Sequence, residues 1–320
     1  MSIGKQVAKR AAELIIILII LSFLTFLLMY LAPGDPAEKR LSSQGVAITK
    51  EVLRAEQERM GLLRPFLERY GEWFVGIIRG DFGLSFKDDM PVAAKLIAGL
   101  KNTSILALAS LLLSLLISVP LGILSAVKKN SLLDHIVRIL SFLGNALPNF
   151  LIAVILMYLF CIQLNLFPVV ATDSLQGLFL PAVSLAIPMA GRFTRQIRTE
   201  IMEQLGKDYV TSLRTRGVRE RKVLIRNVLH NASGHILTMI ALQIGTLMGG
   251  SVVIETIFRW PGIGKLVMDS INARDYPTIM GFVLIMGTIF VVINFISDIV
   301  NQVIDPRIQK SGAALDGKNN

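Results

Sequence analysis

The chain has 320 residues, of which 53% are hydrophobic and only 18% charged; its mean hydropathy is +0.60 and its formal net charge is +10. This composition excludes a disordered chain, because disordered chains are poor in apolar residues. The single cysteine, Cys161, excludes a disulfide scaffold. Positive charge alone would suggest a nucleic-acid partner, but the apolar content indicates a membrane protein first, so no nucleic acid is expected.

Six charge-free runs approach the roughly 20 apolar residues that a helix needs to cross a bilayer. They cover residues 14–31, 103–127, 139–166, 175–190, 236–254 and 279–297. The first run is longer than the apolar core of a signal peptide and no small-residue cleavage site follows it, so an uncleaved helix is expected. The pattern predicts an all-α, multi-pass membrane protein with six transmembrane helices.

Lysine and arginine in the short loops set the expected orientation, because such residues concentrate on the cytoplasmic side. The N-terminal tail, the segments after the second and fourth runs and the C-terminal tail are the basic ones. Both termini are therefore expected in the cytoplasm. In this topology the whole surplus of positive charge faces the cytoplasm.

Four regions are expected along the chain. They are a cytoplasmic N-terminus with the first helix (1–32), an extracytoplasmic segment with amphipathic helices (33–102), a five-helix core (103–308) and a cytoplasmic tail without defined structure (309–320). In the second region Pro65 precedes a helix with aromatic residues on one face. That face suits either the lipid headgroup interface or a contact with the rest of the protein.

The longest polar stretch on the cytoplasmic side lies within residues 192–232 and contains ten basic residues. Apolar positions recur on both sides of Gly217, which predicts two amphipathic helices around a glycine turn. Such helices indicate a partner surface or a helix lying along the membrane. The alternative is a basic loop that only sets topology.

The motifs of several other functions are missing from the sequence. The six runs contain no ionisable residue, which argues against ion-coupled transport. Gly262-Ile263-Gly264-Lys265 is the nearest approach to a phosphate-binding loop, and it lacks the first glycine and the Ser or Thr. The three histidines have no ligand or triad spacing, so no catalytic and no metal residue is predicted. A membrane enzyme is therefore disfavoured, and a stand-alone channel or secondary transporter stays open as an alternative.

Polar side chains inside the spans are candidates for the lining of a pathway, although holding helices together would explain them equally well. They are Asn145, Asn149, Gln243 and Asn294.

Several blocks resemble the permease subunits of binding-protein-dependent ABC importers, in particular the dipeptide/oligopeptide/nickel family. The resemblance runs in order over about residues 10–308. It includes Ala32-Pro33-Gly34-Asp35-Pro36, the stretch Leu213-Arg214-Thr215-Arg216-Gly217-Val218, and Trp260-Pro261-Gly262 followed by Arg274-Asp275-Tyr276-Pro277.

This resemblance implies a type I ABC importer permease fold in a bacterial or archaeal cytoplasmic membrane. It implies that segment 192–232 is a coupling loop, whose helix at about 207–216 sits on an ATPase. The coupling residues carried over are Asp208, Tyr209, Leu213, Arg214, Arg216, Gly217 and Arg221. The residues carried over to the outer loop, which would meet the binding protein or gate the outer face, are Glu255, Trp260, Pro261, Gly262, Asp275 and Tyr276.

The implied partners are a second, similar permease, two ATPase subunits, an extracytoplasmic substrate-binding protein and the lipid bilayer. No cofactor is expected on this chain, since ATP and Mg²⁺ would bind the ATPases. The solute would be a di- or oligopeptide, nickel or a nickel chelate. One departure from the family pattern is Asn231-Ala232-Ser233-Gly234-His235, which lacks a proline and leaves the start of the fifth span open.

Overall fold

The computed structural model describes residues 3–171 and 174–304, and the predicted tail 309–320 lies outside them. Helices make up nearly all of the described residues, and no strand occurs among them apart from one isolated bridge between Leu84 and Pro91. The chain divides into two compact units, Met1–Ser104 with Arg259–Val292, and Ile105–Phe258 with Ile293–Asn320.

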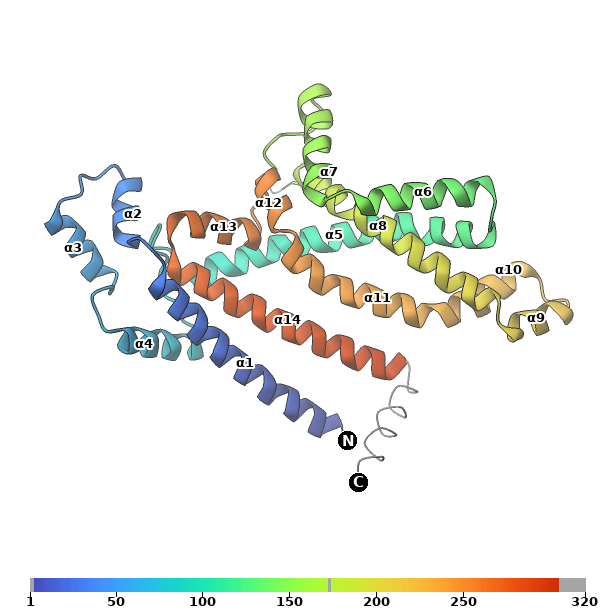
Figure 1. Cartoon of the computed structure of the whole chain (residues 1–320), viewed down its shortest axis with the longest axis horizontal. Coiled ribbons are helices and arrows are strands. Elements are labelled where there is room, and N and C mark those ends of the chain that lie inside the picture. Colours follow the sequence, from blue (N-terminus) through green and yellow to red (C-terminus); the bar gives the residue numbers. More distant parts are fainter. Residues whose placement is uncertain (1–2, 172–173, 305–320) are drawn as a thin grey trace. The chain divides into compact units, whose positions relative to one another are not determined.

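The first unit contains the N-terminal helices and a later segment of the chain (Figure 1). Its helices are α1 (Ile3–Leu31), α2 (Pro36–Ser43), α3 (Lys50–Arg59), α4 (Phe66–Ile78), the beginning of α5 (Val92–Val127), α13 (Ile263–Ala273) and most of α14 (Tyr276–Ile304). Short polar caps set the boundaries of its small helices. Asp35 and Thr49 each accept a backbone N–H in the first turn of α2 and α3.

The second unit is built around one long helix, α8. Its elements are the rest of α5, α6 (Leu132–Ala146), α7 (Asn149–Leu156), the π-helical η1 (Met157–Gln163), α8 (Leu175–Leu205), α9 (Asp208–Thr215), α10 (Glu220–Lys222), the π-helical η2 (Val223–Val228), α11 (Leu229–Gly250) and α12 (Val252–Phe258). Figure 1 shows α6 alongside α8. Glycine permits close approach here, because a Cβ on Gly191 would lie 2.5 Å from the carbonyl oxygen of Ser141.

Four helices are long and apolar enough to span a membrane, namely Ala12–Leu31, Val92–Val127, Leu175–Leu205 and Tyr276–Ile293. Two bent pairs raise the number to six when each pair is taken as one span. The first pair, Leu132–Ala146 with Asn149–Gln163, bends by 99°, and the second, Glu220–Leu247 with Val252–Phe258, bends by 57°. The six predicted spans thus have their counterparts, four as continuous helices and two as broken ones.

The helices differ from the predicted apolar runs in three places. The third span is not one helix over 139–166, because Pro148 holds Leu147 in an extended conformation (ψ 132°) and lacks an N–H to continue the ladder. The fourth continues from 190 to Leu205, so the basic residues of this stretch are on the same helix. The second begins at Val92 instead of 103, and α5 therefore crosses the expected region boundary at 102/103 without a break.

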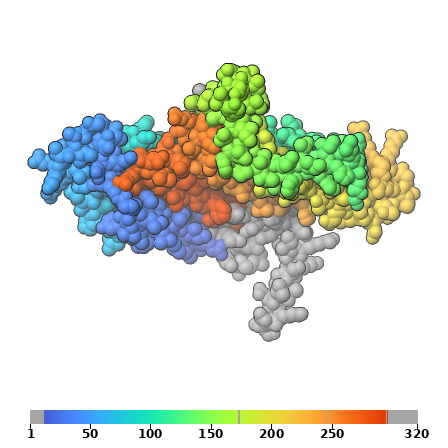
Figure 2. All heavy atoms as spheres, turned by 45° about the horizontal axis from the view of Figure 1, so that its top comes forward, coloured from blue at the N-terminus to red at the C-terminus, as the bar shows by residue number. Residues whose placement is uncertain are grey.

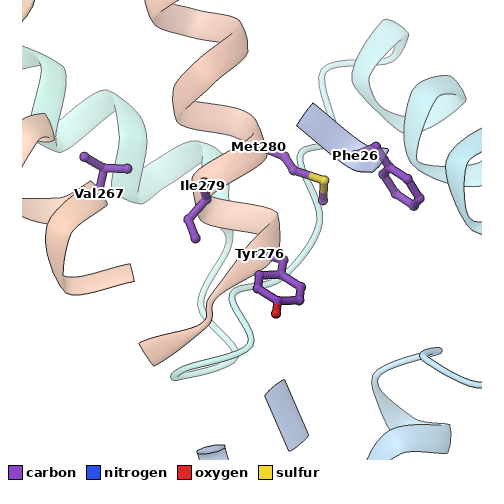
Figure 3. Packing of buried hydrophobic residues seen from close by; sticks show 5 residues of the cluster. All are labelled: Phe26, Val267, Tyr276, Ile279 and Met280. Carbon is purple, nitrogen blue, oxygen red and sulfur yellow. The ribbon is translucent and has the colours of Figure 1, made fainter. Parts of the chain in front are cut away.

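The aromatic face of α4 packs against α1. The ring of Phe26 lies 5.3 Å from that of Phe66, 5.4 Å from Tyr70 and 5.7 Å from Trp73, between centroids. Phe26 also belongs to a buried cluster with residues of α13 and α14 (Figure 3). Of the two interpretations left open by the sequence, the described contacts favour packing on the protein.

Candidate functional site

The predicted coupling loop folds into a short exposed helix between two turns. α8 ends at Leu205, and α9 covers Asp208–Thr215, inside the predicted range 207–216. The charges complement the helix dipole, since Asp208 lies in the first turn and Arg214 in the last. The yellow atoms of this region lie uncovered on the surface in Figure 2.

Gly217 ends α9 in a Schellman motif, the six-residue hydrogen-bond pattern that closes many helices. The N–H of Val218 donates to the carbonyl oxygen of Leu213 at 3.1 Å, and the N–H of Gly217 donates to that of Arg214 at 2.9 Å. The motif needs a residue in the left-handed region, and Gly217 has φ +73°. Gly217, predicted from the sequence as the turn residue, is therefore the residue that ends α9.

One face of α9 is held by the rest of its unit. Val210 is fully buried, and α9 lies against η2, where Val223 and Val228 are also buried. Tyr209 donates its hydroxyl to Oε1 of Gln204 on α8, at 3.2 Å. The opposite face is free, so that α9 is fixed in place while presenting side chains outward.

The outward surface is mostly basic. Asp208, Arg214, Arg216 and Arg221 are exposed, and Leu213 is half-buried. Arg214 bridges the glycine turn by donating to both carboxylate oxygens of Glu220, at 2.6 and 3.1 Å. This hydrogen bond raises the pKa of the Arg214 guanidinium, which stays charged. A rigid, basic helix end is well suited to contact an acidic or amide-rich groove on another protein.

Two of the predicted pathway residues, Asn145 and Gln243, contact Arg192, which lies outside the predicted spans. Arg192 Nε lies 3.5 Å from Oδ1 of Asn145, and its Nη1 lies 3.5 Å from Oε1 of Gln243. Asn149 is half-buried at the first position of α7, just after the bend. Asn294 belongs to α14, and its side chain lies outside the described part.

The predicted outer-loop residues around Trp260 are held by a pair of reciprocal contacts. Trp260 is 2% exposed and donates its indole N–H to the carbonyl oxygen of Asn102 at 3.0 Å. Asn102 in turn donates its side-chain amide to the carbonyl oxygen of Pro261 at 3.0 Å. Gly262 is the residue before α13. Pro261 is the exposed member of this group, and Trp260 shapes the loop from inside.

Two other predicted outer-loop residues are also interior ones. Glu255 on α12 is fully buried and accepts a hydrogen bond from Ser251 Oγ at 2.8 Å. Tyr276 begins α14 and is 8% exposed. The prediction that these side chains meet a binding protein stays a prediction, and within this chain they are turned inward.

Asp275 is the centre of a buried cluster in the first unit. Its carboxylate accepts from Ser85 Oγ at 2.6 Å, from the backbone N–H of Phe86 at 2.8 Å and from Thr278 Oγ1 at 2.7 Å. The ammonium of Lys95 lies 3.8 Å away. Asp275 therefore joins the loop before α5 to the start of α14.

A second buried cluster went unnoticed in the sequence. Asp134 at the start of α6 is fully buried, and Arg198 of α8 donates to both its oxygens, at 2.7 and 2.8 Å. Ser125 Oγ of α5 and the backbone N–H of Asn130 complete its partners at 2.5 and 3.0 Å. The cluster ties α5, α6 and α8 together ten residues before α9 begins. The sequence contains no local indication of this ion pair except an aspartate just after the turn between α5 and α6, because its partner Arg198 is 64 residues away.

No group of three or more His, Cys, Asp or Glu side chains gathers in a way that could hold a metal ion, among the residues described. Cys161 is a buried free cysteine in η1. The site that the geometry does define is an exposed helix at the end of a long, buried helix of an α-helical membrane protein.

These features define the class, a multi-span α-helical membrane protein with a short exposed helix between two of its longer helices. Residues 118–310 match the family described as binding-protein-dependent transport system inner membrane component, and residues 5–107 match its N-terminal region. The chain belongs to this family. It is therefore the permease subunit of an ABC importer and an inner-membrane protein.

Named relatives are similar over nearly the full length. The chain is 35% identical over 307 residues to the nickel import system permease protein NikB of Staphylococcus aureus, covering 96% of this chain and 92% of that one. It is 34% identical to the metal-staphylopine import system permease protein CntB of the same species, covering 96% and 98%. With the oligopeptide transport system permease protein AppB of Bacillus subtilis it shares 36% over 314 residues, covering 95% and 98%.

Solved structures support the fold. The inward-facing methionine ABC transporter MetNI matches with a TM-score of 0.56 and 18% sequence identity, covering 66% of this chain and 96% of that one. An amino acid ABC transporter crystallised with histidines matches with a TM-score of 0.52 and 15% identity, covering 65% and 94%. At these identities the likeness concerns the fold alone.

Proposed function

We propose that this permease forms the translocation pathway for a di- or oligopeptide, nickel or a nickel chelate, delivered by an extracytoplasmic binding protein. Relatives that import nickel, a metal–metallophore complex and oligopeptides support this range of solutes. The observation that supports transport driven by a partner ATPase is the exposed helix α9, stopped by Gly217 and fixed to its unit by Val210.

In this proposal two ATPase subunits bind ATP and Mg²⁺ and receive α9 on their surface, while a second, similar permease completes the pathway. Both termini and α9 lie in the cytoplasm, and the loop 255–277 faces the binding protein. The basic side chains around α9 support this orientation, because cytoplasmic loops are rich in lysine and arginine. ATP hydrolysis then belongs to the partners.

The ion pair of buried Asp134 and partly buried Arg198 gives α9 a rigid group of helices to act on. A displacement of α9 is passed to α8, because α8 precedes it in the chain and only a two-residue turn separates the two helices. Arg198 holds α8 to α5 and α6, so the ends of three helices shift together. Rigid elements with charge-assisted hydrogen bonds are the kind of connection that transmits such a motion.

The docking role of α9 is tested with Leu213→Asp in the full complex with its ATPases and binding protein. We expect the ATPases to dissociate during purification and ATP-driven uptake to fall at least tenfold. Leu132→Asp is the matched control, because it makes the same exchange at a leucine that is 77% exposed at the start of α6. Retention of the ATPases and of uptake in Leu213→Asp would refute the docking assignment.

The solute is tested on the binding protein encoded with this permease, since selectivity in such systems rests largely on that chain. Calorimetric titration with short peptides and with Ni²⁺, free and chelated, should give saturable binding for one of these classes. Binding of none of them would contradict the proposed solute range while leaving the permease assignment in place.

A further inference from the structure

Arg192 places a positive charge beside residues of the predicted membrane spans. It lies on α8, and the two side chains nearest to its guanidinium, Asn145 and Gln243, belong to stretches counted as the third and fifth spans. Ionisable groups at such depth are costly and commonly mark the path of a substrate or ion. The continuation of α8 beyond residue 190 is what brings Arg192 there.

The surroundings of Arg192 orient its charge without neutralising it. Its two contacts are amide oxygens, each at 3.5 Å, which is the long limit of a hydrogen bond. Within the described residues no carboxylate lies within ion-pair distance of Arg192, and its side chain is exposed. A guanidinium has five N–H donors, so most of them remain available.

Arg198, six residues further along α8, is the contrast within the same helix. It donates to both oxygens of buried Asp134 at 2.7 and 2.8 Å. Its charge is thus balanced inside the protein. Arg192 carries the same guanidinium on another side of α8, is exposed, and has only amide oxygens as its side-chain partners, which leaves it available to a carboxylate from outside the chain.

A pocket continues from Arg192 along the groove between α8 and α11. It has a volume of about 460 Å³, and its polar lining includes Arg192, Arg195, Thr199, Glu200 and His235. Glu200 is its single carboxylate, and that group already accepts from Gln204 Nε2 at 2.9 Å and lies 3.8 Å from His235. The two arginines therefore give this groove a positive balance.

We propose that Arg192, oriented by Asn145 and Gln243, binds a carboxylate of the passing solute, so that this permease conducts carboxylate-bearing peptides or metal chelates in preference to the bare divalent cation. The inference rests on the proposed function and narrows its solute class. A guanidinium fork fits a carboxylate in a bidentate manner, which combines charge balance with orientation. A bare divalent cation meets repulsion at the same place.

The test uses the full complex, with both permeases, the ATPases and saturating binding protein, in proteoliposomes. The probes are trialanine, trialanine amide, free Ni²⁺ and Ni²⁺ with two equivalents of histidine. The variants are Arg192→Gln, which removes the charge, and Arg192→Lys, which keeps the charge without the fork. Arg138→Gln is the matched control, at an exposed arginine of α6 away from the pocket.

We expect the wild type to take up trialanine or the histidine chelate faster than free Ni²⁺. Arg192→Gln should lower the initial rate for that probe at least tenfold per assembled complex, and Arg192→Lys less than fivefold. Arg138→Gln should stay within twofold of the wild type.

Three results would overturn the inference. They are an Arg192→Gln rate within twofold of the wild type, free Ni²⁺ entering the wild type faster than both carboxylate probes, and an Arg192→Gln complex that dissociates on gel filtration, which would assign Arg192 to a subunit contact. In each of these cases ATP-dependent uptake by the wild type leaves the proposed function intact. Uptake that continues without ATP would instead overturn the proposed function.

Discussion

Asp134 in the second unit and Asp275 in the first are both fully buried carboxylates, and they are balanced in different ways. Asp134 in the second unit meets the paired N–H donors of Arg198, whereas Asp275 in the first unit meets two hydroxyls and one backbone N–H, with the Lys95 ammonium at 3.8 Å. Both join segments that are far apart in the chain. The difference is that a full charge stands opposite Asp134 and mostly neutral dipoles stand opposite Asp275.

This difference indicates what each cluster does. A bidentate ion pair resists shear between helices, because both partners lose their charge balance if it opens. Hydroxyl and backbone donors instead define the path of a loop, here the turn before α5 against the start of α14. The Asp134 cluster therefore belongs to the helices that move together in the proposed coupling, and the Asp275 cluster to a loop whose path it defines.

The largest expected effect comes from breaking the charged cluster. Asp134→Asn leaves the partly buried Arg198 without its counter-charge, which should lower the free energy of unfolding by about 3 kcal/mol, the low end for breaking a buried pair, because the Arg198 side chain is 16% exposed. Both tryptophans, Trp73 and Trp260, lie in the first unit. The loss should therefore appear more strongly in the thermal midpoint measured by far-UV circular dichroism than in that measured by tryptophan fluorescence.

Two controls sharpen this result. Replacing both partners, as Asp134→Leu with Arg198→Met, should recover most of the stability because no uncompensated charge remains. Glu203→Gln, at a carboxylate that is 64% exposed and paired with Lys207, should change little. A single Asp134→Asn variant as stable as the wild type would remove the basis of the comparison.

Breaking the Asp275 cluster should lower the free energy of unfolding by less. Asp275→Asn keeps one acceptor oxygen for three donors, and an unsatisfied buried donor costs about 1–3 kcal/mol. Here the shift should be seen in the tryptophan fluorescence midpoint, since the cluster and both tryptophans belong to the first unit. Asp269→Asn, whose side chain is 42% exposed, serves as the control. An effect larger than that of Asp134→Asn would reverse the ranking of the two clusters.

The helix α9 follows the Arg198 cluster in the chain. Substitution of the two glycines that flank it tests how strongly Gly217 stabilises the end of this helix. Gly217→Ala places a Cβ in the left-handed region at φ +73° with open space around it, so the cost is one of backbone strain, about 1 kcal/mol. Gly206→Ala, at φ −84°, should be nearly neutral. Hydrogen exchange of the α9 amides should become faster in the first variant only. Equal exchange in both variants would contradict the assigned role of Gly217.

The smallest effect is expected at an exposed carboxylate of the first unit, which sharpens the comparison with buried Asp275. Hydrogen bonds from Arg40, aided by Arg59, lower the pKa of Asp89 to about 2. Because the side chain of Asp89 is 44% exposed, its contribution should remain below about 1 kcal/mol.

A lowered pKa sets the sign of the pH dependence. The contribution of Asp89 is fully present above about pH 4, where the unfolded carboxyl is ionised, and is lost as the pH falls through about 2. The difference in thermal midpoint between the wild type and Asp89→Asn should therefore be constant from pH 5 to 8 and shrink from pH 4 downward. A difference that grows in acid would contradict this reading.

Much of the local structure could be predicted from short-range patterns. The helix after Pro65, the capped helix after Thr49 and the turn at Gly217 follow from residues within one turn of each other. Gly217 was recognised because few other residues adopt its conformation. The position of a proline in the sequence did not predict whether the helix bends there. Pro148 bends the chain by 99°, whereas Pro181 and Pro188 lie inside one continuous helix.

The sequence by itself determined the membrane class, the six spans and the location of the short helix α9, because apolar run length, charge and glycine placement are properties of neighbouring residues. Only the tertiary structure decided which charges are balanced. Arg192 and Arg198 are equivalent in the sequence pattern, yet one meets two amides and the other a buried carboxylate. Those partners come from helices 45 or more residues away, and which side chains meet depends on how the helices pack. No local pattern encodes that outcome.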